Sequence, residues 1–161
     1  MGRVQPGGLP SASTVIAQNV ALAQQMSNEF WQEAEQAANA DPGVLSPAQL
    51  YDAYMTTWLI GQFKIGGPWD YKADQSLWSA NTGTTNLRNF GNFNFGAVLE
   101  SLGVSYYWTQ NAAGIYQALG IGANTQGIPL LQFPYGDSAA DAAVIQQGFT
   151  YESFIQVGCK N

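Results

Sequence analysis

Apolar side chains recur at helical spacing through residues 13–40. Most neighbouring positions in this series lie three, four or seven residues apart, and the series is Ile16, Val20, Ala23, Phe30, Trp31, Ala34 and Ala38. This spacing places them on one face of a helix. The sequence therefore predicts a long helix over residues 13–40, capped by Ser13 and ended by Asp41-Pro42-Gly43.

A second helix is predicted to begin at Ser46-Pro47-Ala48-Gln49. This run offers a capping hydroxyl, a proline in the first turn and a glutamine at the capping-box position. Its buried side is marked by Leu50, Tyr54, Trp58 and Phe63. Gly66-Gly67 is expected to end this helix, which places Lys64 in the last turn, where the helix dipole favours a cation.

The remaining chain predicts three further helices separated by glycine- and proline-rich segments. They run from about Gly91 or Asn94 to Leu102, from Ser105 to about Leu119, and from an Asp137 cap to about Gln147, with a resumption after Gly148 to Ile155. Residues 68–91 are expected to be mostly irregular, with a short β-hairpin left open. The prediction is a mainly α, single compact domain of about five helices over residues 13–161, behind a linker or tail at residues 1–12. A lysozyme-like arrangement is left open.

The composition of the chain argues against several classes of function. The 161 residues carry a net charge of −6, and only 10% of them are charged. Five basic residues, Arg3, Lys64, Lys72, Arg88 and Lys160, argue against a long nucleic-acid footprint, because phosphate neutralisation supplies most of such affinity. No histidine is present, and Cys159 is the only cysteine. We therefore expect no metal site, no cofactor and no internal disulfide, and the chain shows neither a membrane span nor a signal peptide.

Candidate chemistry concentrates in residues 64–96. Lys64 and Lys72 lie eight residues apart with Asp70 between them, among glycines and aromatics. Further along, Asn92 and Asn94 flank Phe93, so both amides would face one side of an extended segment. We expect this segment to line an open cleft.

Three separated motifs in this chain resemble a bacterial polymorphic-toxin family, the toxin type 44 domain. They are G-G-P-W-D-Y-K at 66–72, G-N-F-N-F-G at 91–96, and P-Y-G-D at 134–137 followed by Asp141 and I-Q-Q-G at 145–148. The likeness spans about residues 50–151. The chain departs from the family where it reads Asp137-Ser138-Ala139-Ala140-Asp141 in place of a more acidic, proline-containing run, which leaves the role of Asp137 open.

The toxin resemblance implies a C-terminal toxic domain of a larger secreted or injected antibacterial effector. Such a domain is carried by a secretion apparatus and paired with a cognate immunity protein in interbacterial competition. The family has been considered an RNase. The glycine- and proline-rich lead at residues 1–12 fits a position at the end of a longer polypeptide.

A shorter likeness concerns Asn92-Phe93-Asn94-Phe95-Gly96, followed by Leu102-Gly103. It resembles the N-Y-N-Y-G segment of lysozyme-like plant-type chitinases, in which an asparagine contacts the sugar. The likeness covers about a dozen residues. It implies carbohydrate binding at this segment.

Glycan hydrolysis is the first predicted chemistry, because it needs two carboxyl groups and no histidine. Asp70, between aromatic neighbours, is the candidate acid, and Glu100 or Asp137 the second carboxylate; Glu29, Glu33 or Glu35 could instead supply the acid. The candidate substrate contacts are Trp69, Tyr71, Asn92, Asn94 and Tyr135. In the alternative reading, Asp70 only caps a turn and pairs with Lys64 or Lys72.

RNA cleavage is the alternative chemistry. Lys64 and Lys72 would stabilise the phosphorane, while Asp70 or Tyr71 would handle the proton of the 2′-hydroxyl. The acidic total charge speaks against it. Asp137 and Asp141, one helical turn apart, could share a cation, but a cap and a solvated carboxylate explain them as well.

The prediction is therefore a muramidase-like hydrolase acting on peptidoglycan in the periplasm of a target cell. An RNase would act in the target cytoplasm, and a non-catalytic binding or pore-forming toxin is a third class. On the first reading Asp70→Asn abolishes toxicity without disturbing the fold.

Overall fold

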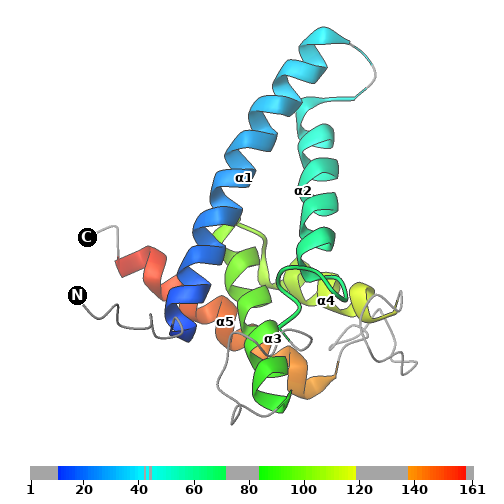
Figure 1. Ribbon diagram of the computed structural model, residues 1–161. Coiled ribbons are helices and arrows are strands. Elements are labelled where there is room, and N and C mark those ends of the chain that lie inside the picture. Colours follow the sequence, from blue (N-terminus) through cyan, green and yellow to red (C-terminus); the bar gives the residue numbers. More distant parts are fainter. Residues whose placement is uncertain (1–10, 42, 44, 72–83, 119–137, 159–161) are drawn as a thin grey trace, which may run out of the picture.

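The computed structural model describes residues 11–41, 43, 45–71, 84–118 and 138–158, and in these residues it is all helix and turn. The five helices are α1 (Ala12–Ala40), α2 (Pro47–Phe63), α3 (Thr84–Ser101), α4 (Tyr106–Ala118) and α5 (Ala139–Gly158), as Figure 1 shows. The mainly α prediction is confirmed. A lysozyme-like arrangement is not. The predicted linker at residues 1–12 lies almost wholly outside the described residues.

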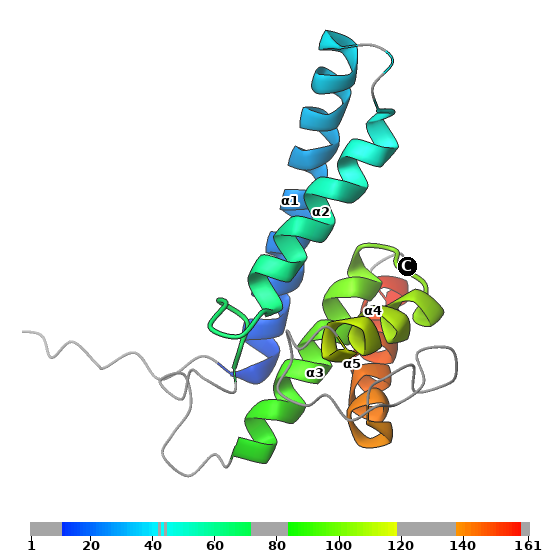
Figure 2. The same cartoon turned by 90° about the vertical axis from the view of Figure 1, so that its right-hand side faces the viewer.

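Helices α1 and α2 form an antiparallel hairpin whose outer half extends beyond the other three helices (Figures 1 and 2). The start of α2 confirms the capping box: the backbone N–H of Gln49 donates to Ser46 Oγ at 3.3 Å, and the Ser46 N–H donates to Gln49 Oε1 at 2.9 Å. The cap of α1 is Ser11, which accepts from the N–H of Thr14. The prediction of Ser13 as this cap is wrong, since the helix already begins at Ala12.

Aromatic rings hold the hairpin together and connect it to α3. Phe30 contacts Tyr54 and Trp58 with ring centroids 6.0 and 6.5 Å apart. Phe63, the last residue of α2, contacts Phe95 of α3 at 4.9 Å. Because each ring buries a large apolar area and prefers tilted or edge contacts, this chain of rings fixes the angle between the hairpin and α3.

The turn after α2 is set by its glycines. Gly66 has φ +74°, a backbone conformation that favours glycine. A Cβ at Gly67 would lie 2.5 Å from the carbonyl oxygen of Gln62, so no side chain fits there. The chain folds back far enough for the N–H of Trp69 to donate to that same Gln62 carbonyl at 2.9 Å. The turn therefore returns Trp69 to the core, where it contacts Phe63 at 5.1 Å.

Helix α3 begins at Thr84, so the prediction of an irregular segment over residues 68–91 is wrong for 84–91, whereas residues 68–71 form a turn as expected. Leu87, Phe90, Ala97 and Val98 recur at helical spacing, and all four are buried or half-buried. Asn92 and Asn94 consequently point in nearly opposite directions, since residues two apart in a helix are turned by roughly 200°. The expectation that both amides face one side is wrong.

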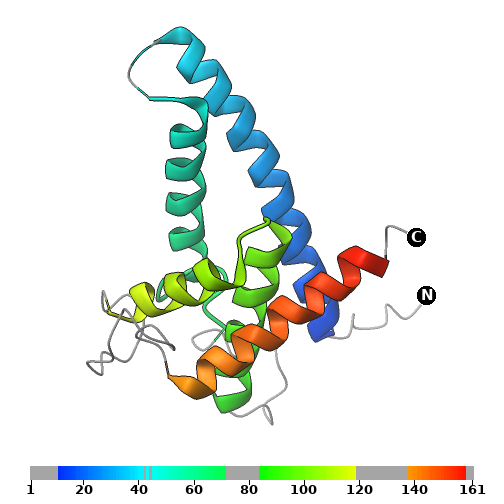
Figure 3. The same cartoon turned by 180° about the vertical axis from the view of Figure 1, so that it is seen from behind.

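Helices α3 and α5 cross at close range through two glycines (Figure 3). A Cβ at Gly96 would lie 2.9 Å from the backbone nitrogen of Phe149 and would collide with the carbonyl oxygen of Ile145. A Cβ at Gly148 would lie 2.7 Å from the carbonyl carbon of Phe93. Gly148 therefore permits a backbone approach and does not interrupt the helix, and the predicted break there is wrong.

The main hydrophobic cluster lies between α1, α3 and the turn after α2. Helix α1 contributes Val15, Ile16, Val20 and Ala23 to a cluster that also holds Trp69, Tyr71, Ala97 and Val98. Helix α4 covers the far side, where the Nε2 of Gln110 donates to the carbonyl oxygen of Ala142 at 3.2 Å. Helix α4 agrees with its predicted range to within one residue at each end.

Candidate functional site

Three of the predicted substrate contacts lie in the core and do not line an open cleft. Trp69, Tyr71 and Asn94 are 5%, 3% and 0% exposed. The amide of Asn19 donates to the Tyr71 hydroxyl at 2.6 Å and to Asn94 Oδ1 at 2.9 Å, which ties α1, α3 and the turn together. The expectation of an open cleft lined by these residues is wrong, because each of them satisfies a packing or hydrogen-bonding need of the fold.

Asp70 closes the turn that follows α2. Its carboxylate accepts the backbone N–H of Gly66 at 2.9 Å, which is the turn-capping alternative named for it above. Lys64 is the exposed C-cap residue of α2, one position beyond the predicted last turn. Lys72, Tyr135 and Asp137 lie outside the described residues.

A carboxylate with converging donors lies where α3 meets the start of α5. Asp141 is buried and accepts from Arg88, from Asn92 Nδ2 at 2.6 Å and from Ser138 Oγ at 2.7 Å. Burial alone would raise the pKa of Asp141, but the hydrogen bonds from Arg88, Ser138 and Asn92 and the charge of Arg88 outweigh it, so the pKa is lowered from 3.8. Asp141 therefore stays ionised and fixes its partners.

The partners of Asp141 come from separate predicted motifs. Asn92 belongs to the run at 91–96, and Ser138 follows the P-Y-G-D run directly. Ser138 also accepts the N–H of Asp141 at 3.1 Å and so closes the first turn of α5. Arg88 has 42% of its side chain exposed, so its guanidinium is oriented by Asp141 while part of it faces solvent.

A second carboxylate cluster lies on the other side of the crossing. Glu100 of α3 is half-buried and accepts the hydroxyl hydrogen of Ser153 at 2.7 Å. Glu152 of α5 is 5% exposed. Burial raises the pKa of Glu152 above 4.5, the Gln156 side chain opposes the shift, and the negative charge of Glu100 raises the pKa further. The two helices thus hold one carboxyl group that resists ionisation beside a second that is hydrogen-bonded to a hydroxyl.

The predicted alternatives on α1 do not join this cluster. Glu29, Glu33 and Glu35 are exposed on the outer half of the hairpin. Glu29 accepts from Gln25 at 2.8 Å, and Glu35 accepts from the indole N–H of Trp31 at 3.0 Å. Their contacts are local to one helix.

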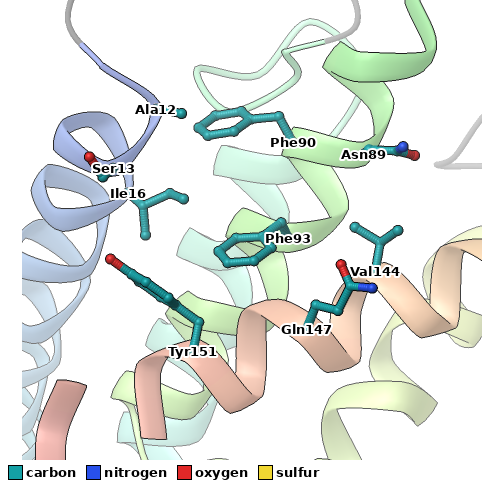
Figure 4. A pocket seen from close by; sticks show the side chains of 9 residues that line it. All are labelled: Ala12, Ser13, Ile16, Asn89, Phe90, Phe93, Val144, Gln147 and Tyr151. Carbon is teal, nitrogen blue, oxygen red and sulfur yellow. The ribbon is translucent and has the colours of Figure 1, made fainter. Parts of the chain in front are cut away.

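An open pocket of about 380 Å³ lies between the first turns of α1, the middle of α3 and one face of α5. Figure 4 shows Phe90 and Phe93 projecting from α3 toward α1, and Tyr151 reaching toward the same space from α5. Among the described lining residues, none is one of those predicted as catalytic. The described lining therefore offers aromatic rings and uncharged polar groups, whereas the two clusters described above are built around carboxylates.

The sequence predicts site roles for Glu100 and Asn92 but none for Glu152, and it predicts Asp141 as a solvated carboxylate or as one that shares a cation with Asp137. The signal for Glu152 was its position among apolar residues, since it lies seven residues after the buried Ile145 and so shares its face of the helix. The signal for Asp141 was its position three residues after Ser138, where a capping interaction is expected.

Comparison of the chain with known protein families, with curated proteins and with solved structures gives no match. None of the described helices is long and apolar enough to cross a membrane. Within the same residues, no three metal-ligating side chains come together.

Proposed function

We propose that this chain is the toxic domain of an antibacterial effector and that it hydrolyses the glycan of peptidoglycan, with Glu152 as general acid and Glu100 as its ionised partner. The observation that carries the proposal is the placement of the buried Glu152 on α5 close to the half-buried Glu100 of α3, which accepts a hydrogen bond from Ser153, the residue next to Glu152. Burial and the charge of Glu100 raise the pKa of Glu152 in this setting. Glycoside hydrolysis needs this division, in which one carboxyl group keeps its proton while the other stays charged.

Each carboxyl group has a defined task in this reaction. Glu152 donates its proton to the glycosidic oxygen while the bond between that oxygen and the anomeric carbon breaks. Glu100 either attacks the anomeric carbon or accepts a proton from water, which are the two classes of this chemistry. The Ser153 hydroxyl, whose Oγ lies 2.7 Å from Glu100 Oε1, fixes the rotamer of Glu100. Substrate approaches from the side of Glu100, because Glu152 is the more buried of the two.

Glu152 replaces Asp70 as the first candidate for the general acid. Asp70 already accepts the backbone N–H of Gly66, so its carboxylate is engaged in closing its own turn. The resemblance to polymorphic toxins supports the effector class. On this proposal the cognate immunity protein is a partner, and the target compartment is the periplasm of a competing bacterium.

RNA cleavage is the second candidate, and the orientation of Arg88 favours it. A guanidinium that is held by a buried carboxylate and is partly exposed is suited to contact a phosphate. The net charge of −6 opposes a broad nucleic-acid surface. An RNase of this kind would act in the target cytoplasm through a small number of contacts.

The two candidates are separated by one pair of assays. Purified protein is incubated with peptidoglycan sacculi and, separately, with total RNA. New reducing ends from sacculi with intact RNA support glycan hydrolysis, whereas degraded RNA with intact sacculi reverses the order. Expression with and without an export signal provides an independent readout, because a glycan hydrolase is toxic only in the periplasm.

A further inference from the structure

We propose that the pocket between α1, α3 and α5 is a binding site for one uncharged sugar ring of the glycan, separate from the carboxylate pair. This inference rests on the proposed function for the identity of the polymer. It adds a subsite in which aromatic rings of the protein pack against the glycan, while amide and hydroxyl groups form hydrogen bonds with the substituents of the sugar.

The walls of the pocket are fixed before any ligand arrives. Phe93 contacts Tyr151 with ring centroids 5.5 Å apart, and the backbone of Phe93 lies against Gly148 at the closest point of the α3–α5 crossing. Phe90 contacts the buried Tyr71 at 4.8 Å. Because these rings are held by the core, little conformational entropy is lost when a ring-shaped ligand packs on them.

The polar groups around the pocket are neutral. Ser13, Asn89, Gln147 and the hydroxyl of Tyr151 line it together with the apolar wall (Figure 4). No carboxylate, lysine or arginine belongs to the described lining. Hydroxyls and side-chain amides both donate and accept hydrogen bonds, so they match the hydroxyl and acetamido groups of a sugar. The volume of about 380 Å³ lies at the lower end of the range for small-molecule sites, which suits a single ring.

Charge decides between a sugar and a nucleotide. A nucleotide would need a cation for its phosphate, and the described lining of the pocket contains neither lysine nor arginine. The net charge of −6 repels polyanions further. A neutral pyranose needs no cation and is not repelled by the net charge, and its apolar ring face can pack on the aromatic wall.

The test is a titration of the whole chain with the trimer of N-acetylglucosamine, in the Glu152→Gln background so that the ligand is not consumed. Gln147→Ala removes an amide from the pocket, and Tyr151→Phe removes one hydroxyl while it keeps the ring. Gln146→Ala, an exposed neighbour outside the lining, is the matched control. The expected result is at least tenfold weaker binding for Gln147→Ala, severalfold weaker binding for Tyr151→Phe and unchanged binding for Gln146→Ala.

Three results would overturn the subsite: no binding of the trimer, equal binding by all three variants, or preferential binding of a nucleoside monophosphate that Gln147→Ala abolishes. Hydrolysis of sacculi is measured in parallel. If hydrolysis depends on Glu152 but the trimer does not bind at the pocket, the subsite is rejected and the proposed function is kept. Sugar binding without hydrolysis by the wild type would reject the proposed function and keep the subsite.

Discussion

Replacing Gly96 with alanine should destabilise the protein, whereas replacing Gly91 in the same helix should stabilise it. Around Gly91 nothing lies within 4 Å of an added Cβ. Around Gly96 an added Cβ would lie 2.9 Å from the backbone nitrogen of Phe149 and 3.0 Å from the carbonyl carbon of Ile145. These are backbone atoms of a helix, so they cannot move aside as a flexible side chain can.

The magnitude follows from two opposing terms. Alanine is favoured over glycine in a helix interior by about 1 kcal/mol, and this alone acts at Gly91. Overpacking costs about 1 to 3 kcal/mol, and at Gly96 the cost lies at the upper end because α5 must shift as a unit. We therefore expect Gly96→Ala to lower the free energy of unfolding by about 2 kcal/mol and Gly91→Ala to raise it by up to about 1 kcal/mol.

The assay is urea unfolding followed by circular dichroism, supported by thermal melting. A difference of about 3 kcal/mol between the two variants corresponds to roughly 6 to 12 °C in Tm for a chain of this size. Gly148→Ala should resemble Gly96→Ala, and the double variant should lose less than the sum, because one separation of the helices accommodates both methyl groups. A Gly96→Ala protein as stable as the wild type would refute the close crossing.

Other predictions concern the polar groups of the fold. Because the pKa of Glu152 is raised above 4.5 in the folded state, its contribution to stability is complete below that pH and is lost as the pH rises through the folded pKa. Glu152→Gln should therefore lack this loss and be more stable than the wild type at neutral pH. If the stabilities of the two proteins, measured by denaturation from pH 4 to 8, changed in parallel with pH, the raised pKa of Glu152 would be contradicted. The pKa of Asp141 is shifted in the opposite direction, so stability should fall as the pH drops below 3.8. Asp141→Asn breaks charged hydrogen bonds and should lower the free energy of unfolding by about 2 kcal/mol at neutral pH. An unchanged midpoint for Asp141→Asn in urea would argue against those bonds. Tyr71→Phe leaves the Asn19 amide without one acceptor and should cost about 1 kcal/mol, a loss that is absent if Tyr71 only packs.

Much of the fold could be predicted from local signals. The box at Ser46 and Gln49 predicts the start of α2, and Gly103, with φ +73°, lies just after α3, as expected for a residue that ends a helix. The start of α3 could not be predicted in the same way. Residues 84–96 hold several asparagines and two glycines, which weaken helix propensity, and only packing against α1 and α5 makes the helix favourable there.

The candidate site was harder to predict, because the motifs that attract attention also build the fold. Gly67, Trp69 and Asp70 form a turn that docks on the core, and Asn94 serves a buried hydrogen-bond cluster. Glu152 lies in an ordinary helical stretch, and its pKa is raised first by burial and then by the charge of Glu100, which lies 52 positions earlier in the chain. Pairing across helices is a property of the tertiary arrangement, and no spacing within either helix reveals it.

The proposed chemistry is tested most directly by reducing-end release from purified sacculi, measured for the wild type, Glu152→Gln and Asp70→Asn at equal concentration of folded protein. General acid catalysis contributes about 10² to 10⁴ in rate, so Glu152→Gln should lose at least about 100-fold while Asp70→Asn stays within about threefold of the wild type. Full activity in Glu152→Gln, or loss of activity in a folded Asp70→Asn protein, would contradict the assignment of the acid to Glu152.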